Sequence, residues 1–132
     1  MIARILCAFL FFIGVFGVSS ASDGINCTGA ESKLWIEKAS FTLDLQTCAL
    51  VNFGIGRLTS ACLSLKYSNI SLLCSDCFGS VVQCGRDKCL IECLKDTGAP
   101  NCVACNTTKG CTASLVECTG FDQVPPNPIP RR

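Results

Sequence analysis

Cysteines are the residues of this chain that could do chemistry, and there are 13 of them among 132 residues. Two C-x-x-C pairs, Cys74 with Cys77 and Cys102 with Cys105, have the spacing of zinc ligands, and their four thiolates would complete a tetrahedral site. The same spacing occurs at thiol–disulfide exchange sites, where an electropositive setting stabilises a thiolate. Asp76 lies between the first two cysteines and disfavours a thiolate there. Zinc binding and redox exchange are therefore the two chemical alternatives to a purely structural role.

Other catalytic chemistry has little support in the composition. The chain contains no histidine, which excludes Ser-His-Asp and Cys-His nucleophiles and histidine-ligated metals. Its acidic residues form no obvious pair of the kind that glycoside hydrolysis needs, and we interpret several of them as solvated helix faces (Glu31, Glu37, Asp44, Glu92 and Glu117). A net charge of +1 provides no basic field for nucleic acid. We expect no enzyme, no metal and no cofactor.

The first residues predict the compartment. Residues 1–21 are predicted to be a cleaved secretory signal peptide. A short basic segment precedes the apolar run from Ile5 to Val18, and small residues precede the predicted cleavage site after Ala21. The run is shorter than the about 20 residues that a membrane-spanning helix needs, and no later stretch is apolar enough to be an anchor. We therefore expect a secreted, extracellular protein without a transmembrane anchor.

Cleavage would change the cysteine count. Cys7 would leave with the signal peptide, so twelve cysteines would reach an oxidising lumen, where an even number predicts a disulfide framework. We predict six structural disulfides among Cys27, Cys48, Cys62, Cys74, Cys77, Cys84, Cys89, Cys93, Cys102, Cys105, Cys111 and Cys118. Three sequons, at Asn26, Asn69 and Asn106, predict a glycoprotein, with Asn69 and Asn106 the better acceptors.

Helices must position these cysteines. A capping box at Thr28 and Glu31 predicts a helix that ends at Gly54 and carries Leu34, Phe41, Leu45 and Cys48 on one face. Alternation at Phe41, Leu43 and Leu45 leaves a short strand as the competitor for residues 41–45. A second helix would bear Leu58, Cys62 and Leu65 and would break near residue 68. Trp35, Phe53, Phe78 and Phe121 are predicted to be partial core.

The clearest helical pattern is a row of apolar residues and cysteines on one face of the next predicted helix. Ile70, Leu73, Cys74, Cys77, Val81 and Cys84 recur with helical spacing, with Ser68 placed as the cap and Gly85 as the end. A shorter helix over 86–96 would carry Cys89 and Cys93, and Asn101 would cap a turn that bears Cys102 and Cys105. These two cysteine pairs are predicted to close one helical hairpin twice. Cys111, Leu115 and Cys118 predict a last helix between Gly110 and Gly120.

The predicted organisation is a signal peptide (1–21), a cysteine-rich helical domain (22–121) and a proline-rich flexible tail (122–132). Within the domain, five cysteines over 62–89 can be laid in order over five cysteines over 93–118. If it is a repeat, this match describes two stacked, disulfide-linked helical units. The fold class that we expect is mainly α, a small bundle or set of hairpins stapled by disulfides.

The stretch CSDCFGSVVQCGRDKCLIECLKDTGAPNCVACNTTKGCTASLVECTG, residues 74–120, resembles a cysteine-rich module of uncharacterised secreted proteins from single-celled eukaryotes. The resemblance lies in the order of the cysteines, and it implies no activity. Compartment and scaffold together predict a non-enzymatic protein that presents a rigid surface to an extracellular protein partner, such as an effector, ligand or surface module. The alternative is a membrane-active or lipid-binding helical protein, because disulfide-linked helices can enclose an acyl chain.

Overall fold

The structure is a computed structural model that describes residues 25–128. The predicted signal peptide and the last four residues of the predicted tail lie outside these residues. Along the described part the helices are α1 (Gly29–Glu37), α2 (Ser40–Val51), α3 (Gly56–Lys66), α4 (Leu72–Lys88), α5 (Leu90–Cys93), α6 (Pro100–Thr108) and α7 (Cys111–Thr119). Residues 25–128 contain no β-strand.

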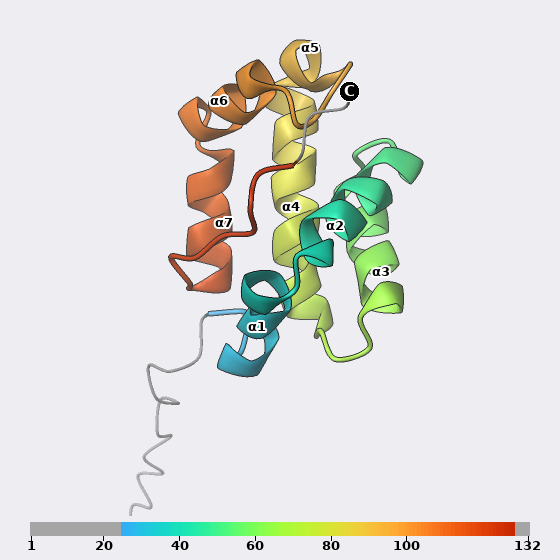
Figure 1. Cartoon of the computed structure of the whole chain (residues 1–132), viewed down its shortest axis with the longest axis vertical. Coiled ribbons are helices and arrows are strands. Elements are labelled where there is room, and N and C mark those ends of the chain that lie inside the picture. Colours follow the sequence, from blue (N-terminus) through green and yellow to red (C-terminus); the bar gives the residue numbers. More distant parts are fainter. Residues whose placement is uncertain (1–24, 129–132) are drawn as a thin grey trace, which may run out of the picture.

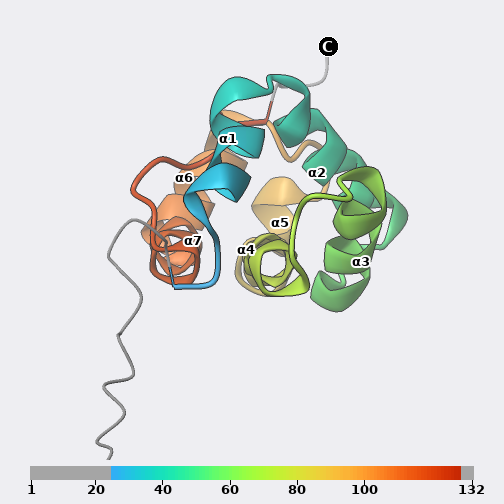
Figure 2. The same ribbon diagram turned by 90° about the horizontal axis from the view of Figure 1, so that it is seen from below.

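Helices α3, α4 and α7 lie side by side in one layer, with α4 in the middle (Figures 1 and 2). Helices α1 and α2 cross one face of this layer, and α5 and α6 lie at the end where α4 finishes (Figure 1). Six disulfides join these elements. The predicted fold class, a mainly helical bundle stapled by disulfides, is confirmed.

The first predicted helix is two helices. The capping box at its start is present, since the Thr28 hydroxyl accepts from Glu31 N at 3.2 Å and Thr28 N donates to the Glu31 carboxylate at 2.7 Å. The chain then leaves the helical conformation at Lys38 and re-enters it at Ser40, so a continuous helix over this segment was the wrong prediction, as was the alternative strand.

An aromatic core explains the break. On one continuous helix, Trp35 and Phe41 would point about 120° apart. With the break between them, both rings pack on Phe78 of α4 with centroid distances of 5.0 Å. Phe121 and Tyr67 complete the cluster from the two sides. The predicted core role is thus correct for Trp35 and Phe78, which are fully buried, and for Phe121, which is partly buried.

Helix α3 is present where predicted, but it does not bury the predicted face. Leu58 and Leu65 are exposed, and the residues that face inward are Gly56, Thr59, Ser60 and Leu63. The small residues let α3 approach α4 closely, so that Gly56 meets Gly79 backbone to backbone. Buried hydroxyls fill the same seam, with Ser60 Oγ 3.0 Å from Ser75 Oγ. The prediction followed the large apolar side chains, whereas close helix packing selects small ones.

Helix α4 carries the predicted cysteine stripe with corrected ends. Its N-cap is Ser71, whose hydroxyl accepts from Cys74 N at 3.2 Å, and not Ser68. Gly85 lies inside the helix against Asn106 of α6 and does not end it. Leu73, which was assigned to the buried stripe, is 65% exposed.

The following elements differ from the predicted ones mainly at their boundaries. Helix α4 continues to Lys88, so the predicted 86–96 helix is reduced to the four residues of α5. Helix α6 begins at Pro100 with Ala99 as its N-cap, because proline fits the first helical position, and Asn101 lies inside the helix. Helix α7 lies between Gly110 and Gly120, as predicted, and both of these glycines have positive φ.

One buried hydroxyl carries a stability prediction. Thr59 Oγ1 on α3 is buried and finds no hydrogen-bond partner among the described residues. An unsatisfied buried hydroxyl costs about 1–3 kcal/mol, so we expect Thr59→Val to raise the free energy of unfolding by about 1 kcal/mol, measured by urea denaturation. The matched variant is Thr119→Val. The Thr119 hydroxyl is equally buried but donates to Leu115 O at 3.0 Å, so its removal is expected to destabilise. Opposite signs for the two variants support the assignment, and equal signs refute it.

Candidate functional site

All twelve cysteines of the described residues form disulfides. Four of these bonds are nested, and they join α4 and α5 to α6 and α7 in antiparallel order: Cys77–Cys118, Cys84–Cys111, Cys89–Cys105 and Cys93–Cys102. The two innermost bonds are those of the predicted hairpin. Two further bonds, Cys27–Cys74 and Cys48–Cys62, attach the N-terminal helices.

The pairing does not follow the repeat seen in the sequence. Each of the four nested bonds joins one cysteine before residue 97 to one that lies almost equally far after it along the chain. The cysteine spacing is therefore mirrored about residue 97, whereas a repeat would have the same order in both halves. A mirrored spacing is what two antiparallel helical segments require if their facing positions are to meet. This signal was present in the sequence and would have identified four of the six bonds.

The cysteines of each C-x-x-C pair are bonded to partners elsewhere and not to each other. Cys74 is joined to Cys27, and Cys105 is joined to Cys89. Zinc coordination requires thiolates, and each described cysteine sulfur is already in a disulfide. A C-x-x-C exchange site forms its disulfide between its own two cysteines, and neither pair is bonded in that way here. The arrangement therefore gives these residues a structural role.

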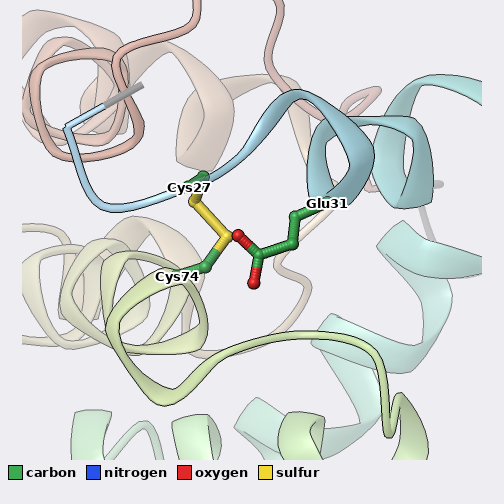
Figure 3. A group of neighbouring side chains, drawn as sticks. All are labelled: Cys27, Glu31 and Cys74. Atoms are coloured by element: carbon green, nitrogen blue, oxygen red, sulfur yellow. A yellow bond between two sulfur atoms is a disulfide. The ribbon is translucent and has the colours of Figure 1, made fainter. Parts of the chain in front are cut away.

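One carboxylate lies beside a disulfide, at Cys27, Cys74 and Glu31 (Figure 3). The sulfurs of this group are bonded to each other, and the carboxylate is engaged by backbone N–H groups. Glu31 accepts from Thr28 N at the start of α1 and from Ser71 N, the N-cap of α4, at 2.5 Å. Glu31 was interpreted as part of a solvated face. In the structure it is buried and ties two helix starts together.

This position predicts a pH dependence. Burial acts to raise the pKa of Glu31, but the hydrogen bonds from Thr28 and Ser71 outweigh it and lower the pKa below its ordinary value of 4.5. A lowered pKa in the folded state adds stability that is present above pH 4.5 and is lost as the pH falls through the folded pKa. We expect Glu31→Gln to cost about 1–2 kcal/mol at pH 7 and to flatten the loss of stability in acid, measured by thermal unfolding across pH. Glu37→Gln, on the exposed face of the same helix, is the control, and an unchanged pH profile in Glu31→Gln would contradict the prediction.

An apolar groove of about 530 Å³ lies between α2 and α6. Thr42, Leu45 and Ala49, on one face of α2, form one wall, and Val81 and Val82 of α4 line it as well. Val103 and Asn106 of α6 contribute from the other side. Nothing in the sequence alone pointed to this site, because its lining comes from segments that are far apart along the chain.

The scaffold holds the two walls apart. Helix α2 packs on α3, while the nested disulfides fix α6 and α7 against α4. Gln46 of α2 donates to the Thr97 hydroxyl at 2.6 Å, which joins the walls at one point. Gly85 lines the groove without a side chain of its own. The groove is thus a preformed feature of the stapled helices.

The C-terminal segment forms a further part of the lining. Trp35 Nε1 donates to Gln123 O at 2.8 Å, and the Thr42 hydroxyl donates to Pro126 O at 2.9 Å. Between and beyond these bonds, residues 124–128 line the groove with valine and prolines. As far as residue 128, the predicted tail is therefore seated along α1 and α2, in front of α4 (Figure 1).

The rim of the groove exposes large apolar side chains. Leu50, Phe53, Leu90 and Leu94 line the groove and are also exposed, with Phe53 at 83%. The predicted core role of Phe53 is wrong. Its φ of 54° lies in the left-handed region, which is an unusual conformation for an aromatic residue. Strained and exposed residues of this kind are found at functional sites more often than elsewhere.

The three sequons have different surroundings. Asn69 is exposed in the turn between α3 and α4. Asn26 Nδ2 donates to Cys118 O at 2.9 Å, and Asn106 Nδ2 donates to Cys102 O at 3.1 Å beside Gly85. A glycan on either of the last two would displace these contacts. Asn69 is therefore the sequon whose side chain is sterically available, and its glycosylation stays a prediction.

Comparison with known proteins provides no assignment. Within residues 25–128 no helix has both the length and the hydropathy needed to cross a membrane. The resemblance of residues 74–120 to a secreted cysteine-rich module stays a prediction. The chain matches no protein-family model, no curated protein and no solved structure.

Proposed function

We propose that this chain is a secreted, non-enzymatic binding protein whose α2–α6 groove takes up a small apolar ligand. The observation that carries the proposal is the groove itself. Its volume of about 530 Å³ lies within the range of small-molecule sites, about 300–1,000 Å³. Its lining is rich in leucine, valine and proline, and none of the described residues that form it is acidic. A binding role needs no catalytic group.

Rigidity supports the same proposal. A site that exists before the ligand arrives avoids the ordering cost of forming it, and nested disulfides supply such preorganisation here. The disulfide framework also fits the oxidising extracellular compartment that the first residues predict. Lipid binding is the alternative function that the sequence predicts. The groove supports an apolar ligand more directly than it supports protein recognition, so we rank ligand binding first.

The proposal is tested with a neutral apolar fluorophore, N-phenylnaphthylamine, titrated into the oxidised protein. We expect saturable binding that Leu50→Asp weakens at least about tenfold, because the carboxylate must be desolvated in the groove. Leu58→Asp is the matched control, since Leu58 has nearly the same exposure, 42% against 43%, and does not line the groove. Circular dichroism shows whether both variants are folded. No saturable binding, or equal losses in the two variants, would refute the proposal.

Recognition of an extracellular protein is the second candidate. The observation that favours it is the exposed apolar rim formed by Phe53, Leu90 and Leu94, since such patches on soluble proteins mark interaction surfaces. The test is capture of extracellular proteins by the immobilised, oxidised chain. A partner that binds through the rim should be lost in Phe53→Asp and retained in Leu65→Asp, an exposed site outside the groove. A partner that both variants retain, or the lack of any specific partner, counts against this candidate.

A further inference from the structure

Arg86 is the one charged side chain that lines the groove, as far as the described residues form it. The other lining residues are apolar or are neutral polar residues such as Gln46 and Thr112. A cation at an otherwise uncharged apolar surface favours a ligand that combines an apolar body with a negative charge. The charge of the groove therefore distinguishes between ligands that its apolar lining alone would accept equally.

The position of Arg86 suits a head group. It lies in the last turn of α4, and its aliphatic stem packs on Gly54, where an added Cβ would come within 3.0 Å of Arg86 Cδ. Gly54 also has a φ of 69°, so the turn after α2 both requires a glycine and leaves room for the stem. The Arg86 side chain both lines the groove and is 43% exposed, so it is accessible to a ligand and to solvent.

The neighbouring charge leaves this cation available. Arg86 Nε is 3.8 Å from Asp87 Oδ1, and both side chains are about half exposed. Ion pairs of such length at the surface contribute little. A guanidinium carries five donors, and its planar fork matches the two oxygens of a carboxylate. A ligand carboxylate can therefore form a bidentate contact that Asp87 does not block.

The apolar lining of the groove runs along one face of α2. It follows α2 from Thr42 to Leu50, a distance of about 12 Å at 1.5 Å per helical residue, and continues to Phe53 in the turn after the helix. Val82 precedes Arg86 by one turn of α4, so the apolar floor continues directly from the cation. A single hydrocarbon chain can lie over this floor while its head group meets Arg86.

We infer that the ligand of the groove is a fatty acid, with its carboxylate on Arg86 and its hydrocarbon chain along α2. This inference rests on the proposed apolar-ligand function. One guanidinium balances one carboxylate, whereas a phosphate monoester carries close to two charges at neutral pH. The singly charged carboxylate is thus the better match for a groove with one cation.

The test compares three ligands of one chain length, dodecanoic acid, dodecanol and dodecylamine, as competitors of bound N-phenylnaphthylamine. We expect the acid to bind about tenfold more tightly than the alcohol, and the amine to bind most weakly. Arg86→Gln should reduce the affinity for the acid about tenfold and bring it close to the affinity for the alcohol. Arg57→Gln, at an exposed arginine of α3 outside the groove, is the control and should change neither.

The outcomes separate this inference from the function on which it rests. Fluorophore binding with equal affinities for acid and alcohol, or with no effect of Arg86→Gln, overturns the fatty-acid inference and leaves the apolar-ligand function standing. No fluorophore binding removes both. Fluorophore binding that declines with rising protein concentration, together with a dimer in sedimentation, assigns the groove to a second copy of the chain and also overturns the inference.

Discussion

Replacing Gly79 by alanine is expected to lower the free energy of unfolding by about 2–3 kcal/mol, one of the two largest effects that we predict. A Cβ at this position would overlap the backbone carbonyl oxygen of Gly56 and would lie 3.1 Å from Ser60 Cβ. The obstacle is backbone, which cannot rotate away as a side chain can, so α3 must move from α4. The gain in helix propensity from glycine to alanine, about 1 kcal/mol, offsets only part of this cost.

Gly85→Ala is the matched control, because Gly85 is also a buried glycine inside α4. There the added Cβ would meet the side-chain oxygen of Asn106 at 2.6 Å, and that side chain can turn aside. We expect a change of less than about 1 kcal/mol. Both variants are measured by urea denaturation with the disulfides intact. Equal costs at the two positions would contradict the close α3–α4 contact.

Removal of the Cys27–Cys74 disulfide is expected to cost about 3–4 kcal/mol, measured on the Cys27→Ala/Cys74→Ala double variant. The bond spans a sequence separation of 47, and Cys48–Cys62 shortens the loop that it closes. What remains, from Cys27 to Cys48 and from Cys62 to Cys74, is about 33 residues, the basis of the estimate. Both sulfurs are buried, so the truncation also leaves a cavity.

The comparison is with the innermost bond of the nested set, removed as Cys93→Ala/Cys102→Ala. With Cys89–Cys105 still formed, this bond closes a loop of only about seven residues, and we expect a loss of about 2 kcal/mol. Guanidinium denaturation of the two double variants gives the ranking. A larger loss at the inner bond would show that nesting does not set the contribution of each disulfide.

Local features of this protein follow from the sequence alone. The Thr28 capping box, the glycine boundaries of α7 and the helical spacing of the cysteines in α4 each depend on residues within a few turns of one another. The double closure of the hairpin by Cys89, Cys93, Cys102 and Cys105 was also predictable, because the two cysteine pairs are close in the chain. Local hydrogen bonding and helical periodicity determine such features without reference to distant residues.

The remaining features were decided by tertiary structure. Periodicity identifies which residues share a helix face but not which neighbour covers that face, so the buried side of α3 was assigned to Leu58 and Leu65 and not to Gly56 and Thr59. The break between α1 and α2 arises because two aromatic rings must reach Phe78. The groove is likewise nonlocal, since α2, α4, α6 and the C-terminal segment contribute to its lining. The sequence by itself determined the helical class, several local helix boundaries and the cysteines available for disulfides. Only the packed arrangement of the helices created the groove, because a concave surface is formed by several segments at once.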